Sequence, residues 1–347
     1  MLLIILLMPP AVLVDGKGYL YVITFYLLFL SFLFGDFLLR WSTIYYSKEI
    51  LNIWQSLLKV EGLRNFKYSG RMKLYFVLTA LVFGQMAENI FTVIQSDYNI
   101  DESLIVPERL KYLRWLHKSF CIASDTLTSI FLIYAILFVS LIGIASISWY
   151  EVCLKKLVKI VERTGTLKQD FKATIILAGT LELKIFAEEF TRVKQCLEDY
   201  CKIAGNYALI LVLNCTISLT IFFSDKMAGR QSNPSSSYYL GCIGLILLIA
   251  SLGNFMTNTV QEMQEKLSNT AAVLLLSLDT NLGHILQWVL RWRWKMSAFD
   301  LFDINYGVIL QIIGVMLTYL VFFFQLKILE DPLSTRLESK NVSCACV

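Results

Sequence analysis

Residues 306–326 read YGVILQIIGVMLTYLVFFFQL, a run of 21 residues without a charged side chain. About 20 apolar residues in a helix cross the hydrocarbon core of a bilayer, which is about 30 Å thick. The run is therefore long and apolar enough to span a membrane. Its few polar side chains indicate what kind of span it forms.

One face of this helix is mostly polar or small, while the other faces carry Val, Ile, Leu and Phe. The positions on that face are three or four residues apart and so lie on one side of a helix: Gln311, Gly314, Thr318, Phe322 and Gln325. A buried amide needs a hydrogen-bonding partner, whereas an amide that faces water is solvated. The stripe therefore favours a helix that lines a water-filled pore. Close packing of Gly307 and Gly314 against a neighbouring span is the competing interpretation.

The rest of the chain has the composition of a membrane protein. Apolar residues make up 56% of it, charged residues only 17%, and the mean hydropathy is +0.61, which is more apolar surface than a soluble domain can bury. The sequence predicts an all-α fold, a polytopic membrane bundle of six to seven transmembrane helices with long cytoplasmic helical extensions. The six runs of spanning length are residues 19–39, 74–95, 127–149, 207–223, 238–256 and 306–326.

The first 14 residues are also apolar, but they are too short to cross a bilayer and contain Pro9 and Pro10. We interpret residues 1–14 as a partial or truncated first transmembrane helix; a cleaved signal peptide is the alternative, although no basic stretch or small-residue cleavage site stands out. The remaining chain divides into transmembrane helices with cytoplasmic helical loops at 15–257, a cytoplasmic anchor helix region at 258–304, a final pore-lining helix at 305–327 and an extracellular tail at 328–347.

The distribution of basic residues predicts the orientation. Of the 31 Lys and Arg residues, 21 lie in the three loops that follow the spans ending at 39, 149 and 256, and basic loops tend to stay in the cytoplasm. This orientation places the N-terminus in the cytoplasm and the C-terminus outside the cell, in a multi-pass protein of the plasma membrane.

Two of these loops carry apolar stripes typical of helices that pack on other helices. The stripes are Leu183, Phe186, Phe190, Val193, Leu197, Tyr200 and Ala204, and Leu267, Ala271, Leu274, Leu278, Leu282, Ile285 and Val289. In residues 288–295, Trp288, Trp292 and Trp294 are interleaved with Arg291, Arg293 and Lys295. For that segment, a position on the inner leaflet is as good an interpretation as helix packing.

Polar residues within spans tend to face a bundle interior or a wet cavity. Several fall in the outer halves of neighbouring spans and predict one cleft for a small molecule: Gln85, Glu88, Asp125, Tyr134, Tyr238 and Tyr239, together with Thr216, Ser218 and Thr220. The alternative is that the hydroxyls bond back to their own helices and the tyrosines form an interfacial belt.

Catalytic, metal and nucleic-acid functions have little support in the sequence. The two histidines, His117 and His284, fall on opposite sides of the membrane in the predicted topology, and no phosphate-binding glycine loop or nucleophile motif is present. The net charge of +4 forms no nucleic-acid patch. We therefore expect no enzymatic activity, no metal site and no cofactor.

The end of the last span resembles the C-terminal signature of insect gustatory receptors: Thr318 and Tyr319, five hydrophobic residues and Gln325, with Leu326 where phenylalanine is usual. The segment FDLFDINY at 299–306 and the loop layout of nearly the whole chain are also similar to that family. The resemblance implies a homo- or heterotetramer with related receptors, in which the last span lines one central pore.

In that family a small-molecule tastant binds in the outer half of the bundle and opens a nonselective path for cations. The resemblance therefore implies that Gln325 and Leu326 lie at the pore constriction. Leu320 stands where sugar receptors usually carry an acidic residue, which favours a bitter-type or orphan member.

Two other functions are alternatives. A G-protein-coupled seven-helix receptor would have the opposite orientation and would normally carry an acidic-Arg-aromatic triplet and an Asn-Pro-x-x-Tyr run, neither of which is present. A secondary transporter would normally show inverted repeats with broken spans, and the sequence has none.

Overall fold

The structure is a computed structural model of the 347-residue chain. The structure describes residues 30, 34–59, 73, 75, 77–81, 84, 127, 129–166, 172–227, 236–274, 280–298 and 301–343; the side chains at 164–166, 172–180, 225, 227, 236–238, 273–274, 280, 323 and 326–343 lie outside this description.

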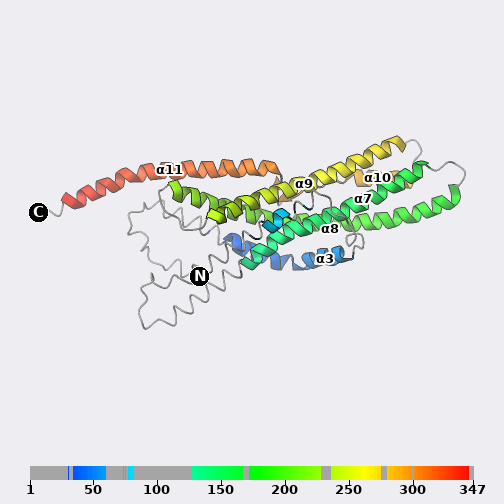
Figure 1. Ribbon diagram of the computed structural model, residues 1–347, viewed down its shortest axis with the longest axis horizontal. Coiled ribbons are helices and arrows are strands. Elements are labelled where there is room, and N and C mark those ends of the chain that lie inside the picture. Colours follow the sequence, from blue (N-terminus) through cyan, green and yellow to red (C-terminus); the bar gives the residue numbers. More distant parts are fainter. Residues whose placement is uncertain are drawn as a thin grey trace, which may run out of the picture.

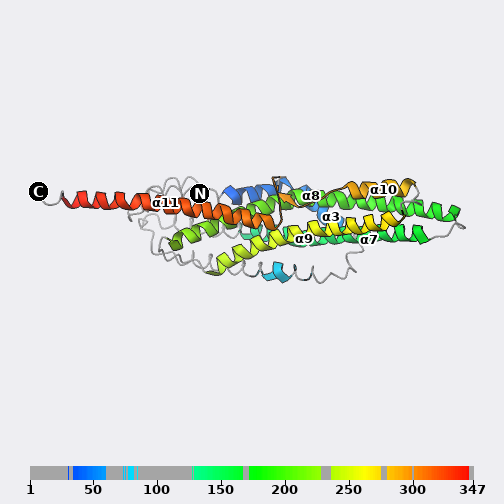
Figure 2. The same ribbon diagram turned by 90° about the horizontal axis from the view of Figure 1, so that it is seen from above.

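The described residues are almost entirely helical. The labelled elements are α3 (Ser47–Leu58), the π-helix η4 (Phe138–Ile142), α7 (Gly143–Thr166), α8 (Lys172–Met227), α9 (Ser236–Leu274), α10 (Thr280–Arg291), β1 (Ser297–Ala298), β2 (Phe302–Asp303) and α11 (Tyr306–Ser343). Residues 34–45 lead into α3 and residues 129–137 lead into η4 as further helix. The helices run along one long axis, and α11 extends from the middle of the molecule to the C-terminal end (Figures 1 and 2).

Within the described residues, three helices are long and apolar enough to cross a membrane: Ser129–Arg163, Leu181–Ser224 and Tyr239–Ala272; a shorter apolar helix covers Tyr306–Phe322. These four helices contain the predicted span at 207–223, all but one or two residues of the spans at 127–149 and 238–256, and most of the span at 306–326. The all-α membrane bundle is therefore confirmed. The predicted spans at 19–39 and 74–95 fall largely, and residues 1–14 wholly, outside the described residues.

The long helix α8 confirms the first predicted stripe. Its 56 residues run without a break from the predicted cytoplasmic loop into the predicted span, and all seven stripe residues are buried: Leu183, Phe186, Phe190, Val193, Leu197, Tyr200 and Ala204. A helix with one apolar face gains stability by burying that face against its neighbours. Here those neighbours are α7 and α9.

The second stripe is divided between two helices. α9 ends at Leu274, α10 begins at Thr280, and the two pack against each other. Leu267 and Ala271 are buried on α9, and Leu282 and Val289 on α10. The side-chain amide of Gln264 on α9 donates to the carbonyl oxygen of Val289 at 3.3 Å and to that of Trp292, which satisfies acceptors at the end of α10.

Trp292 and Trp294 pack inside the protein and not on the membrane surface. Trp292 Nε1 donates to Glu198 Oε1 at 3.1 Å, and Trp294 Nε1 donates to the Leu197 carbonyl oxygen at 3.3 Å. The segment after α10 is extended, so alternate residues point in opposite directions. Both tryptophans are buried, while Arg293 is exposed. For these two tryptophans, the helix-packing interpretation is the correct one.

Two further findings refine the predicted organisation. β1 and β2 form a short antiparallel hairpin, with Ser297 opposite Asp303 and Ala298 opposite Phe302, in a region where only helix was expected. In addition, α11 continues beyond residue 327 to Ser343, so most of the segment predicted as a tail is helical.

Candidate pore and ligand site

Among the described residues, one face of α11 contacts the rest of the chain. Val308 is buried, and Ile309, Ile312 and Met316 pack, half-buried, against the hydrophobic core. These residues are three or four positions apart, so they form a single contact face, which meets α8 and α9. The other faces of the helix, with exposed residues such as Leu310 and Leu317, do not pack on the part of the chain that the structure describes.

The predicted pore stripe lies on the unattached part of α11. Gln311, Gly314, Thr318, Phe322 and Gln325 are all exposed. The Thr318 hydroxyl donates to the Gly314 carbonyl oxygen at 2.9 Å, a local bond within the helix. A Cβ added at Gly314 would meet no atom within 4 Å. Among the described residues, the stripe is therefore not covered by its own subunit. The backbone of Leu326 lies in α11, but its side chain is outside the description.

The surroundings of Gly307 and Gly314 test the competing interpretation, in which these glycines allow close packing against a neighbouring span. A Cβ at Gly307 would meet only the side chain of Asn305, with its nearest atom, Oδ1, at 2.9 Å. Within the part of the subunit that the structure describes, neither Gly307 nor Gly314 packs against another span.

The start of α11 is held by two glycines on neighbouring helices. A Cβ at Gly205 on α8 would lie 2.2 Å from the Ser297 carbonyl oxygen, and a Cβ at Gly253 on α9 would lie 2.2 Å from the Ile304 carbonyl oxygen. No side chain fits at either position, because the backbone of the hairpin occupies the space. The Cys201 thiol adds a contact of 3.5 Å to the Lys295 carbonyl oxygen. The hairpin is thus fixed between α8 and α9 immediately before α11.

The predicted ligand residues fall into separate places. The Tyr134 ring is half-buried, 6.1 Å from that of Phe138 and 6.4 Å from that of Tyr207. Tyr239 is buried and stacks on Phe222 at 3.9 Å between ring centroids. Phe222 and Tyr207 are 15 positions apart on α8, or about 22 Å along its axis. The structure therefore does not bring Tyr134 and Tyr239 into one cleft.

Of the other predicted ligand residues, some lie outside the described residues and two threonines bond within their own helix. Gln85, Glu88, Asp125 and the side chain of Tyr238 lie outside the described residues. On α8, the hydroxyl of Thr216 donates to the Val212 carbonyl oxygen at 2.7 Å, and that of Thr220 donates to the Thr216 carbonyl oxygen at 2.8 Å. Both threonines bond back to their own helix, as the alternative interpretation predicted.

The structure adds polar contacts that sequence patterns did not predict. The Tyr207 hydroxyl donates to Thr43 Oγ1 at 2.9 Å. The Asn214 side chain is buried, its Oδ1 has no hydrogen-bond partner among the described residues, and it lies so close to Gly35 that a Cβ there would be 2.4 Å away. A glycine and an asparagine in different helices give no periodic signal, so only the fold reveals this contact.

Among the described residues, no group of three or more His, Cys, Asp or Glu side chains could hold a metal ion.

No protein-family model and no curated protein matches the chain. Among solved structures, the chain is similar to the insect olfactory receptor OR5 from Machilis hrabei in complex with eugenol, with a TM-score of 0.55 and 13% sequence identity. The similarity covers 85% of this chain and 79% of that one. It shows that the two proteins share a fold, the helical membrane bundle of that receptor.

Proposed function

We propose that the chain is a subunit of a ligand-gated, nonselective cation channel with the role of an insect gustatory receptor. The observation that carries the proposal is the stripe on α11: two amides, a hydroxyl and a glycine on an otherwise apolar helix, left uncovered by the rest of the described chain. The fold shared with an insect olfactory receptor supports the same conclusion.

The physical reason is the cost of leaving amides in hydrocarbon. A primary amide without a hydrogen-bonding partner costs several kcal/mol in an apolar medium. Four copies of α11 around one axis would place Gln311 and Gln325 in water, with Gln325 and Leu326 at the constriction. The exposed apolar residues of the other faces, such as Leu310 and Leu317, would meet lipid or the neighbouring copies.

The ligand in this proposal is a small-molecule tastant that binds in the outer half of the bundle. It opens the pore only if it binds the open arrangement better than the closed one, and a few kcal/mol of differential affinity shift a balanced equilibrium. Tyr134 beside Tyr207, and the buried Asn214 amide, are the described groups best suited to contact it. Gln85, Glu88 and Asp125 remain candidates from the sequence.

The subunit has its N-terminus in the cytoplasm and its C-terminus outside the plasma membrane in this proposal, and it assembles as a homo- or heterotetramer with related receptors. The alternative, a G-protein-coupled receptor, has the opposite orientation. Epitope tags at both ends, detected with and without permeabilising the cells, distinguish the two topologies.

The channel activity is tested by reconstituting the purified protein in planar bilayers and measuring its mass in detergent. We expect an assembly of four subunits and unitary cation currents when bitter alkaloids are added; sugars are tested alongside and are expected to be inactive. A monomer that carries no current, alone or co-expressed with related receptors, would contradict the proposal.

A further inference from the structure

A π-helix, η4, interrupts the helix that carries Tyr134. Residues 129–137 are α-helical, Phe138–Ile142 form η4, and α7 continues from Gly143. A π-helix is wound with hydrogen bonds from i to i+5 and occurs mostly as a single turn inside an α-helix, frequently at functional sites. Relative to a regular α-helix, such a turn contains one extra residue.

The two parts of the helix are held differently. In α7 one face is fully buried, with residues three or four positions apart: Ile144, Ile147, Tyr150, Leu154, Leu157 and Val161. In residues 129–137, Ala135 and Ile136 next to η4 are fully buried, whereas residues 131–134 are all half-buried, so the buried face of α7 is not continued by a fully buried face beyond residue 135 among the described residues. The packing therefore fixes the rotation of α7 more strongly than that of residues 129–134.

One side chain from α8 inserts at the π-turn. The fully buried Tyr200 hydroxyl donates to the Val139 carbonyl oxygen at 2.5 Å, and the Tyr200 ring stacks on Phe138 at 6.0 Å. A Cβ at Gly143 would lie 2.4 Å from the same hydroxyl oxygen and 2.9 Å from Tyr200 Cζ. The hydroxyl thus fills the space that a side chain at position 143 would occupy, and it stabilises an acceptor of the π-turn.

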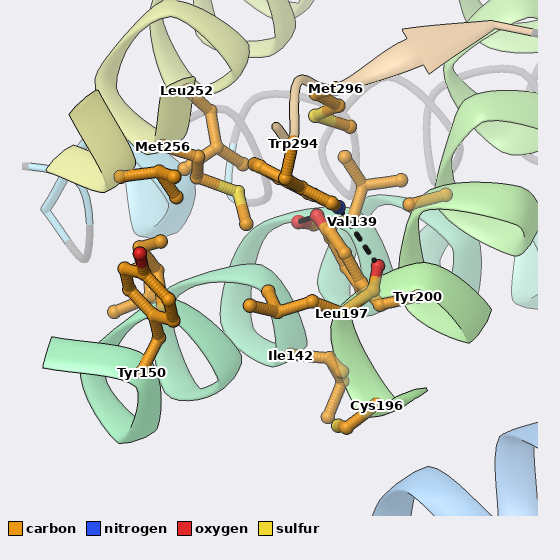
Figure 3. Close-up of a cluster of buried hydrophobic side chains, with 14 of the residues drawn as sticks. Val139, Ile142, Tyr150, Cys196, Leu197, Tyr200, Leu252, Met256, Trp294 and Met296 are labelled. Carbon is orange, nitrogen blue, oxygen red and sulfur yellow. Dashed lines mark hydrogen bonds between the residues drawn. The ribbon is translucent and has the colours of Figure 1, made fainter. Parts of the chain in front are cut away.

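The same cluster reaches the segment before α11. Leu197, one turn from Tyr200 on α8, accepts the hydrogen bond of Trp294, and Val139, Tyr200, Met256, Trp294 and Met296 gather in one buried group (Figure 3). Met256 Sδ would lie 3.2 Å from a Cβ at Gly143. The π-turn is therefore in contact with α8 and α9 and, through Leu197, with the segment that leads into the pore helix.

We propose that η4 is a conformational switch that links the outer part of this helix to α11. If the π-turn becomes α-helical, residues 129–137 move by one residue relative to α7, which is a rotation of about 100° and a shift of about 1.5 Å. The Tyr200–Val139 hydrogen bond breaks, and Tyr200 moves against Leu197 and Trp294. Only the last step, transmission to the pore, rests on the proposed function.

The rotation can be measured without a ligand or a current. The distance is measured between two nitroxide labels at Ile130 and Leu247, which are exposed residues in the outer parts of their helices. The labels are attached through keto amino acids, so that the native cysteines stay in place. Gly143→Ala, whose Cβ displaces the Tyr200 hydroxyl, should convert η4 to α-helix. On a helix about 10 Å wide, a 100° rotation moves the end of the Ile130 side chain by about 8 Å, so the distance between the labels should change.

Deleting Leu141 provides the matched test, because it removes the extra residue of the π-turn and keeps the register on both sides. We expect the deletion combined with Gly143→Ala to restore the wild-type distance. Gly283→Ala, where an added Cβ meets no atom within 4 Å, is the neutral control. Tyr200→Phe removes only the hydroxyl and should convert part of the population from the π-turn to the α-helical form. If Gly143→Ala does not fold, the label distance in Tyr200→Phe tests the switch instead.

If the distance between the labels is unchanged in folded Gly143→Ala, the proposal that η4 switches is overturned. If only Tyr200→Phe folds, an unchanged distance in that variant overturns it. Resting cation flux measured in the same samples tests the transmission. A changed distance with unchanged flux would overturn the link to α11. If neither the variants nor the wild-type protein conducts ions, that result contradicts the proposed function, and the distances still decide whether η4 switches.

Discussion

The carbonyl oxygen of Ile304 lies directly over the backbone of Gly253, so that a Cβ at this glycine would be only 2.2 Å away. Ile304 is two residues before the start of α11, and the same kind of contact joins Gly205 to Ser297 on the other side of the hairpin. The position of the candidate pore helix is therefore set by two backbone contacts that tolerate only glycine.

Gly253→Ala should lower the stability of the protein. In the interior of an exposed helix, replacing glycine with alanine stabilises by about 1 kcal/mol. Here the added methyl group meets backbone that cannot move aside, and such overpacking costs about 1–3 kcal/mol. Thermal unfolding of the detergent-solubilised protein measures the difference. Gly283→Ala, in the open space on α10, is the control and should be neutral or stabilising. Equal melting temperatures for Gly253→Ala and wild type would refute the tight contact.

Trp294 should matter to stability through both its volume and its hydrogen bond. Trp294→Ala removes a large buried side chain, which costs about 3–5 kcal/mol. Trp294→Phe keeps most of the ring surface but loses the bond to Leu197, which costs about 0.5–1.5 kcal/mol. Leu301→Ala, at a residue that is 75% exposed, should change stability by less than about 0.5 kcal/mol. If Trp294→Ala behaved like Leu301→Ala, Trp294 would not be packed in the core.

The ion pair between Lys295 and Asp303 should contribute little. The two groups are 2.8 Å apart, but their side chains are 63% and 41% exposed, and exposed pairs are worth about 0–1 kcal/mol. A double-mutant cycle with Lys295→Gln and Asp303→Asn measures the coupling, which should decrease as salt is added. A large coupling energy that does not change with salt would contradict this prediction and would show that the Lys295 and Asp303 side chains are shielded from solvent.

The sequence predicted those parts of the fold that repeat along a helix. The stripe from Leu183 to Ala204 was identified because a buried helical face recurs every three or four residues. By contrast, Trp292 and Trp294 gave an ambiguous pattern, since bulky apolar residues interleaved with basic ones suit both a membrane surface and an extended segment inside a protein. Only their contacts with Glu198 and Leu197 decide between the two.

The contacts that fix the candidate pore could not be predicted in this way. Tyr200 and Val139 are 61 residues apart, and the π-turn differs from an α-helix by a single residue without any change in composition. Gly205 looks like any glycine in an apolar helix until the hairpin is placed against it. The exposure of Gln325 likewise depends on which face of α11 meets α8 and α9, and a stripe in the sequence does not specify that face.

The most direct test of the proposed pore is the single-channel conductance of the reconstituted protein when Gln325 is changed. Gln325→Ala should alter the single-channel cation conductance or the resting leak while leaving surface expression unchanged, because the exposed amide faces the ions in the proposed pore. Leu317→Ala, on an exposed face of α11 outside the stripe, should leave the conductance as it is. A Gln325→Ala channel with wild-type conductance and leak at full surface expression would contradict the assignment of α11 as the pore helix.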